Sequence, residues 1–159
     1  MRNHITSFGE FTCAHCGYLV SAAHSLSGVN NRNHCPYCLW SCHLDLFAAG
    51  DRLSACKGPM KPIGLTMKRS RNKYRLEARG ELMLIHECAD CGSLSINRIA
   101  ADDDSESILT VFQDSLRHSH QKFRLCEGQG ILMLGTDALQ AVQVQLFGPR
   151  LEALIPMWE

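Results

Sequence analysis

Three cysteine pairs are the clearest chemical feature of this sequence. Each has the form C-x-x-C, and they are Cys13 with Cys16, Cys35 with Cys38, and Cys88 with Cys91. Thiolates at this spacing can bind one zinc ion together, and the eighteen residues between the first two pairs fit a structural zinc site. We therefore predict that the first two pairs share one ion.

The third pair, Cys88 and Cys91, needs two more ligands to complete a tetrahedral zinc site. Cys56 is the natural third ligand, because its loop has no other evident anchor. We predict His43 as the fourth. Three alternatives for this fourth ligand stay open, namely His86, Cys42 and Asp45. Spacing also permits a cross-braced arrangement, in which ligand pairs are exchanged between the two zinc ions.

The elements around these ligands follow from the pattern of apolar residues. Pro36 suits the first turn of a helix, and an i, i+3, i+4, i+7 pattern from Leu39 predicts that this helix runs to Gly50. A helix that starts at a ligand pair, preceded by a C-x-x-C-G knuckle, predicts a treble-clef-like site. The same helix would carry His43 to the second metal.

The third pair lies between two predicted strands, over residues 81–87 and 93–99, which indicates a zinc-ribbon hairpin. The acidic run 101–106 is typical of a helix start, and a strand over 131–134 and a last helix from about residue 139 follow. We thus predict a small α+β, zinc-stabilised fold. Residues 1–104 form the two-site domain, and residues 105–159 form a helix–strand–helix extension packed on it.

The composition limits the possible functions. The 159 residues are 45% hydrophobic, and 16 basic residues balance 16 acidic ones, so any nucleic-acid contact must come from a local patch. Nine cysteines are an odd number and argue against a pure disulfide framework. The N-terminus lacks a signal-peptide core, and no apolar run is long enough to span a membrane. We expect a cytoplasmic protein without membrane contact.

A basic stretch around one aromatic residue is the candidate patch. It contains Lys68, Arg69, Arg71, Lys73, Tyr74 and Arg75. Cations there can bind phosphate while the tyrosine stacks on a base, and Arg32 and Arg98 are further candidate contacts. The alternative interpretation is a solvated loop whose charges only maintain solubility.

The residues 32–36, Arg-Asn-His-Cys-Pro, spell the name of a bacterial family, and the sequence resembles the RNHCP domain family over most of its length. The similarity continues at Cys38, His43, Asp45, at 50–52, and at Cys56. It continues further at His86, Cys88, Cys91, at 97–100 and at 102–103. This resemblance implies a bacterial cytosolic protein with cysteines arranged for metal, and it implies no settled activity.

Three functions are compatible with these features. We favour a non-enzymatic protein with two zinc ions that binds RNA or a ribonucleoprotein such as the ribosome. The first alternative is a His-metal-type nuclease that uses His34, His43 and Asp45, with Asn97 or Arg98 on phosphate. The second is a protein-interaction adaptor that uses the last helix and the apolar end near Trp158. A redox role for the cysteine pairs is a weaker idea.

Overall fold

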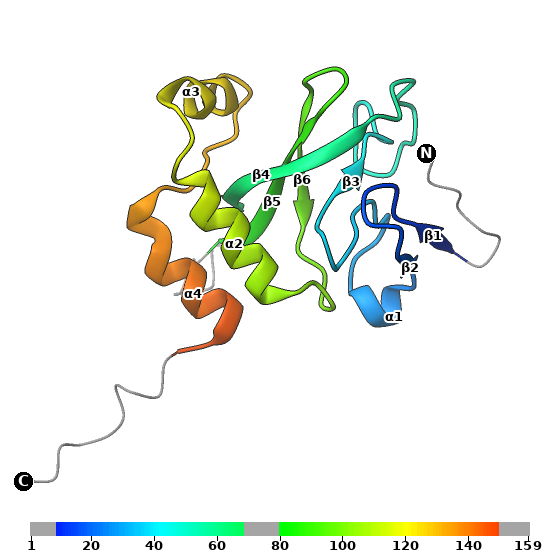
Figure 1. Ribbon diagram of the computed structural model, residues 1–159, viewed down its shortest axis with the longest axis horizontal. Coiled ribbons are helices and arrows are strands. Elements are labelled where there is room, and N and C mark those ends of the chain that lie inside the picture. Colours follow the sequence, from blue (N-terminus) through cyan, green and yellow to red (C-terminus); the bar gives the residue numbers. More distant parts are fainter. Residues whose placement is uncertain (1–8, 69–79, 150–159) are drawn as a thin grey trace, which may run out of the picture.

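The computed structural model describes residues 9–68 and 80–149 of the chain, as a mixture of helices and strands (Figure 1). In chain order the elements are β1 (Glu10–Thr12), β2 (Leu19–Ser21), α1 (His24–Ser27), β3 (Ser41–Cys42), β4 (Pro59–Lys68), β5 (Glu81–Cys88), β6 (Leu94–Arg98), α2 (Ser105–Ser115), α3 (His120–Gly128), the 3₁₀ turn η1 (Thr136–Ala138) and α4 (Leu139–Phe147). The mixed helix and sheet content agrees with the predicted α+β class.

Two antiparallel sheets organise the chain. The small one pairs β1 with β2, and the larger one has the order β3-β4-β5-β6. β4 and β5 form its long central hairpin, with a register shift between Pro62 and Gly64. The strand–knuckle–strand hairpin expected near Cys88 is present, because β5 pairs with β6 on either side of that turn. No helix in the described ranges is both long and apolar enough to cross a bilayer.

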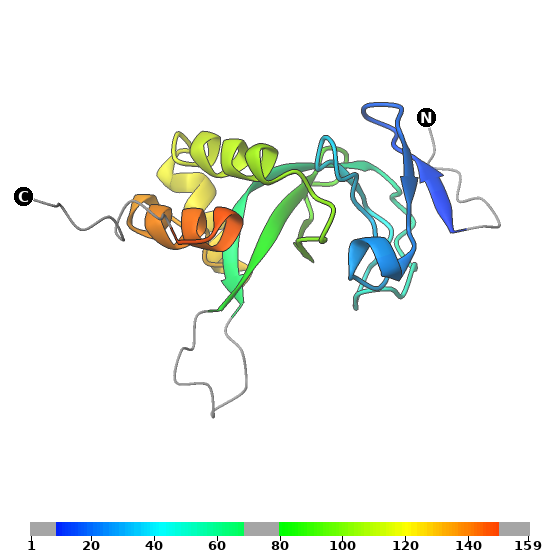
Figure 2. The same cartoon turned by 90° about the horizontal axis from the view of Figure 1, so that it is seen from below.

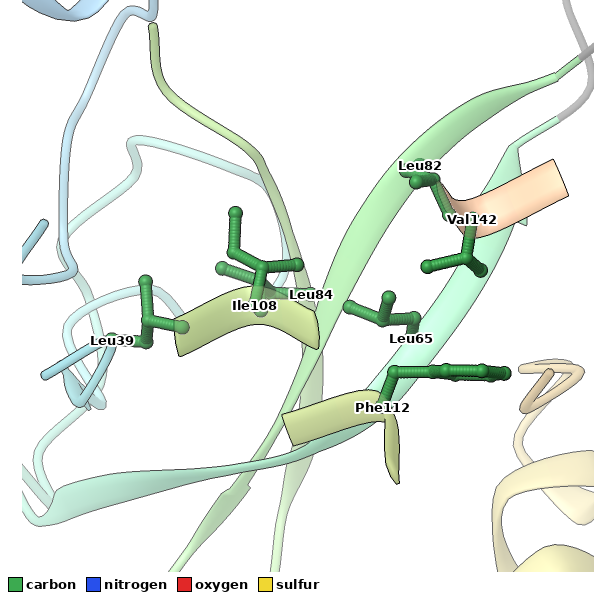
Figure 3. Close-up of a cluster of buried hydrophobic side chains, with 7 residues drawn as sticks. All are labelled: Leu39, Leu65, Leu82, Leu84, Ile108, Phe112 and Val142. Atoms are coloured by element: carbon green, nitrogen blue, oxygen red, sulfur yellow. The ribbon is translucent and has the colours of Figure 1, made fainter. Parts of the chain in front are cut away.

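The main hydrophobic core lies between the sheet and the helical layer (Figure 3). It contains Leu39, Leu65, Leu82, Leu84, Ile108, Phe112 and Val142. Helix α2 supplies Ile108 and Phe112 one turn apart, and its start is capped by the carboxylate of Asp104, which accepts from the Ser107 N–H at 2.9 Å. Figure 2 shows α2 and α4 packed beside the hairpin, while β1, β2 and α1 lie at the opposite end of the molecule.

The helix predicted from Pro36 to Gly50 is wrong. Residues 36–38 form a turn instead, Leu39 adopts a left-handed φ of 61°, and the short strand β3 follows. The apolar period does not mark one helix face, because Leu39 is fully buried in the core whereas Phe47 is 84% exposed. Since a treble clef requires a helix at the second ligand pair, the structure does not support the treble-clef-like arrangement.

Candidate metal centres

The first candidate metal centre brings four thiols from two turns together. The sulfur atoms of Cys13, Cys16, Cys35 and Cys38 all lie within 4.8 Å of one another. The Sγ atoms of Cys13 and Cys38 are 3.6 Å apart, as are those of Cys16 and Cys35. A Zn–S bond of about 2.3 Å gives tetrahedral edges of roughly 3.8 Å, whereas a disulfide needs about 2.0 Å. The group therefore fits one zinc ion.

The same backbone turn presents both pairs. The N–H of Gly17 donates to the carbonyl of Cys13, and the N–H of Leu39 donates to that of Cys35, each at 2.9 Å. Gly17 and Leu39 both have positive φ, at 79° and 61°. Glycine adopts this conformation freely, whereas leucine is strained in it. Complete burial of the Leu39 side chain in the main core offsets that strain, so the second turn doubles as a core anchor.

The surroundings of this group favour a bound cation. Phe11 and Val20 pack against Cys13 and Cys35 in a small apolar cluster. Burial raises the pKa of the Cys35 thiol to about 11, so ionisation here requires a positive counter-charge. A zinc ion supplies that charge, since its thiolate ligands are held deprotonated.

The second candidate centre is made from three separate segments. His43, Cys56, Cys88 and Cys91 have their ligand atoms within 4.8 Å of one another. The Sγ atoms of Cys56 and Cys88 are 3.6 Å apart, and the Cys91 Sγ lies 3.3 Å from the His43 Nδ1. The His43 backbone N–H donates to the carbonyl of Gly58 at 2.9 Å, which fixes its segment beside the Cys56 loop. This group also fits one zinc ion, so the chain can hold two.

The structure places the alternative fourth ligands elsewhere. The His86 Nε2 bonds to the carbonyl of Leu39 at 2.7 Å, and burial lowers the pKa of His86 to about 3, which keeps the ring neutral. The Cys42 thiol donates to the carbonyl of Lys57, and Asp45 accepts from the N–H groups of Gly50 and Arg52. Because the first two pairs meet in one group, the ligand pairing is sequential and not cross-braced.

The two groups differ in their access to solvent. Cys13 and Cys35 of the first group are buried, whereas Cys91 of the second is exposed. Hydrogen bonding with the side chain and backbone of Ser93 lowers the pKa of the Cys91 thiol to about 6. An exposed, readily ionised thiol is open to protons, chelators and thiol reagents.

We expect the second group to release its zinc before the first. With a chromogenic chelator in excess, zinc should leave in two phases of about one ion each, because the exposed Cys91 opens one shell to attack. A Cys91→Ser variant should bind one tight zinc per chain and lose the fast phase. Release in a single phase of two ions would contradict this order.

The predicted nucleic-acid contacts have different positions. Arg69, Arg71, Lys73, Tyr74 and Arg75 lie outside the described residues, whereas Lys68 is exposed at the end of β4. Arg98 is exposed and its guanidinium pairs with Glu81 at 2.8 and 3.1 Å. Arg32 is a correction to the sequence analysis: its side chain is 0% exposed, so it cannot contact a nucleic acid.

Arg32 belongs to a buried ionic network that the sequence analysis missed. Its guanidinium pairs with Asp102 at 2.8 Å and Asp103 at 3.1 Å, and the second carboxylate oxygen of Asp103 lies 2.7 Å from the His34 Nε2. The Ala100 N–H also donates to Asp103, at 2.7 Å. From the sequence, the acidic run 101–106 indicates a helix start, with a magnesium site as the less favoured alternative. The position of Arg32, three residues before the metal ligand Cys35, could have predicted an ion pair, because a charged side chain that becomes buried there needs a partner of opposite charge.

The proposed nuclease residues do not form one metal-binding cluster. His34 is buried against Asp103, His43 belongs to the second metal group, and Asp45 bonds to backbone N–H groups. Within residues 9–68 and 80–149, the clusters of His, Cys, Asp and Glu that could hold a metal are the two four-membered groups alone.

Comparison with known proteins agrees with this geometry. A family model described as the RNHCP domain matches residues 8–109, which is more than half of the chain and includes all eight ligands of the two groups. No curated protein and no solved structure matches the chain.

Proposed function

Because the chain belongs to the RNHCP domain family, we propose that it is a non-enzymatic protein in which two zinc ions support a surface that binds RNA or a ribonucleoprotein such as the ribosome. The observation that carries the zinc part is the convergence of two complete four-ligand groups. A structural zinc site has four protein ligands, whereas a catalytic one leaves a position open for water or substrate. Closed shells favour a scaffold over a hydrolase.

The zinc ions would hold hairpins in place. We assign β5, its knuckle and β6 to the zinc-ribbon class, because Cys88 ends one strand and the Cys88 N–H donates to the carbonyl of Ser93 at the start of the return. Zinc-thiolate sites of this kind are typical of a reducing compartment, which supports a cytoplasmic location. Short, rigid hairpins suit the recognition of RNA loops and grooves.

The proposal of RNA binding rests on the position of the basic stretch in the chain, between the end of β4 and the start of β5. Lys68, the last residue of β4, lies opposite Glu81, the first residue of β5, in the antiparallel register. The cations of the basic stretch therefore belong to the connection between two paired strands. On a chain of balanced net charge, these cations close together in sequence are the candidate local patch for phosphate.

Reversing the charges of Lys68, Arg69 and Arg71 to glutamate should weaken RNA binding at least about tenfold at low salt. Each lost cation removes a phosphate contact and the counterions that the contact releases, so the salt dependence should become shallower as well. Fluorescence anisotropy with a labelled single-stranded RNA, at several salt concentrations, measures both.

A double variant, Arg117→Glu with Arg124→Glu, is the control for charge reversal away from the basic stretch, because both residues are exposed cations of the helical part of the chain. It should bind RNA nearly as the wild type does. Binding that is indifferent both to salt and to the triple charge reversal would reject the RNA proposal.

The adaptor function has one observation in its favour. A cavity of about 600 Å³ lies between α2 and α4, lined by apolar side chains that include Leu109, Val144 and the half-exposed Phe147. Exposed apolar surface of this kind can mark a protein contact. Co-purification of one protein partner that survives nuclease treatment would favour the adaptor over the RNA-binding protein.

A further inference from the structure

A loop fixed by hydrogen bonds carries Phe47, the most exposed aromatic residue in the described part of the chain. Residues 44–53 form no helix or strand, and Phe47 within them is 84% exposed. The Asp51 carboxylate accepts from the N–H groups of Leu46, Phe47, Ala48 and Leu53, at 2.8 to 3.0 Å. These bonds hold the pKa of Asp51 well below its usual range.

Two further residues fix the loop. Asp45 accepts from the N–H groups of Gly50 and Arg52, at 2.8 and 3.1 Å. Gly50 has a φ of 87°, and a side chain there would collide with Asn31. The backbone around Phe47 is thus ordered by two carboxylates, while the aromatic ring itself gains little burial. Such an arrangement favours a ring that is kept ready for a partner.

Phe47 stands at the edge of a polar hollow. Cavities of about 360 and 250 Å³ adjoin there, because both are lined by Asn33, Asp45, Ala49, Ile96 and Asn97. Phe47 and Leu46 line the larger cavity, and Lys68 and Arg98 line the smaller. An apolar platform at one end and cations at the other match a nucleobase and its phosphate.

The wall between these ends can form hydrogen bonds. The Asn97 Nδ2 donates to the His86 Nδ1 at 2.9 Å, while the Asn97 carbonyl oxygen accepts nothing from the residues that the structure describes. Strand β6 pairs with β5 on one side and with no other described strand. Its remaining backbone groups can donate and accept. The Asp45 carboxylate lines the hollow with the Arg52 guanidinium 3.7 Å away. Glu81 pairs with the Arg98 guanidinium at 2.8 and 3.1 Å, so a bound phosphate would share Arg98 with Glu81.

We propose that this hollow binds one unpaired nucleotide, with the base stacked on Phe47 and the phosphate near Lys68 and Arg98. The inference rests on the proposed RNA binding, since Lys68 lines the hollow and is also the first residue of the basic stretch. That continuity favours a nucleotide over an extended peptide added to β6. A nucleotide within a single-stranded RNA and a free nucleoside monophosphate both offer a base and a phosphate, so either could occupy the hollow.

The test compares Phe47→Ala with Leu53→Ala in the zinc-loaded full chain. Leu53 is an exposed apolar residue of the same loop, 61% exposed, and it does not line the hollow. The ligands are a labelled ten-nucleotide single-stranded RNA and the same backbone with abasic positions. Phe47→Ala should weaken binding to the normal RNA about tenfold, from the loss of one base stack. It should leave binding to the abasic RNA and the slope against salt unchanged.

The other outcomes separate the two proposals. If the wild type binds RNA and Phe47→Ala binds it equally well, the hollow is no nucleotide site, and the basic stretch alone carries the proposed function. If the wild type binds neither RNA nor uridine monophosphate, both proposals are overturned. Displacement of the RNA by uridine monophosphate, lost in Phe47→Ala, assigns the hollow to free nucleotides as well. A zinc content of two ions in each variant confirms that the fold is kept.

Discussion

Replacing Cys35 by serine is expected to abolish the cooperative unfolding of this protein. Cys35 is fully buried and belongs to the first metal group. A structural zinc contributes on the order of 10 kcal/mol in isolated zinc-finger peptides, which rivals the roughly 5–15 kcal/mol that stabilises a whole domain. Thermal unfolding followed by circular dichroism should lose its sharp transition, and zinc bound per chain should fall from two ions to one at most.

Cys126 supplies the matched control for this prediction. It is equally buried, it lies in α3 outside both metal groups, and it packs with Ile63 and Ile85. Cys126→Ala should keep two zinc ions and cost only about 1–2 kcal/mol, as expected for a small loss of buried volume. Two bound zinc ions and a wild-type transition in Cys35→Ser would contradict the assignment of the first group.

Replacing Asp103 by alanine should lower the free energy of unfolding by about 3–5 kcal/mol. The change removes the carboxylate that pairs with the fully buried guanidinium of Arg32 and with His34, and it leaves the N–H of Ala100 without its acceptor. Arg32 keeps Asp102, but it loses its only fully buried carboxylate partner, and an incompletely paired buried charge costs far more than the pair itself contributes. Urea denaturation of the zinc-loaded protein measures the loss.

Asp102 is the control for this second prediction, because it pairs with the same guanidinium while its own side chain is 36% exposed. Asp102→Ala should cost about 1 kcal/mol or less. A second variant, Asp103→Ala with Arg32→Met, removes the buried guanidinium that keeps only Asp102 as a carboxylate partner, and it should recover part of the loss. Equal costs for the Asp102 and Asp103 variants would show that burial does not govern this network.

The Arg-Asn-His-Cys-Pro run thus combines two structural roles. Cys35 is a metal ligand, whereas Arg32 and His34 bind the acidic residues that precede α2. The Asp104 N–H also donates to the carbonyl of Pro36, at 3.2 Å. These contacts attach the second knuckle to the start of the helical layer. We therefore expect damage to the network to loosen the contact between the metal-binding part and α2.

The metal groups could be anticipated from residue types and spacing. Thiols at C-x-x-C intervals have few other uses in a chain with three such pairs, and tetrahedral zinc limits each group to four ligands. That count left room for two ligands beside Cys88 and Cys91, and Cys56 and His43 are the residues that the structure places there. The β5–β6 hairpin and α2 were equally accessible, because alternation and helical spacing are local properties of the chain.

Long-range contacts decided the remaining features. Asp103 reaches Arg32 across 71 positions, and no local pattern announces such a pair. The helix expected after Pro36 does not form, because the thiol of Cys38 joins the first metal group while the next side chain, Leu39, packs in the main core. Those two demands come from partners far along the chain, and they outweigh the helical period of residues 39–47. The strand predicted over 131–134 is also wrong, because Met133 alone forms an isolated bridge, with Thr66, and Leu132 is 67% exposed. Local periodicity therefore predicted β5, β6 and α2, where neighbours in sequence are also neighbours in space. It was wrong at residues 36–50, where metal coordination and core packing divide a segment between distant partners.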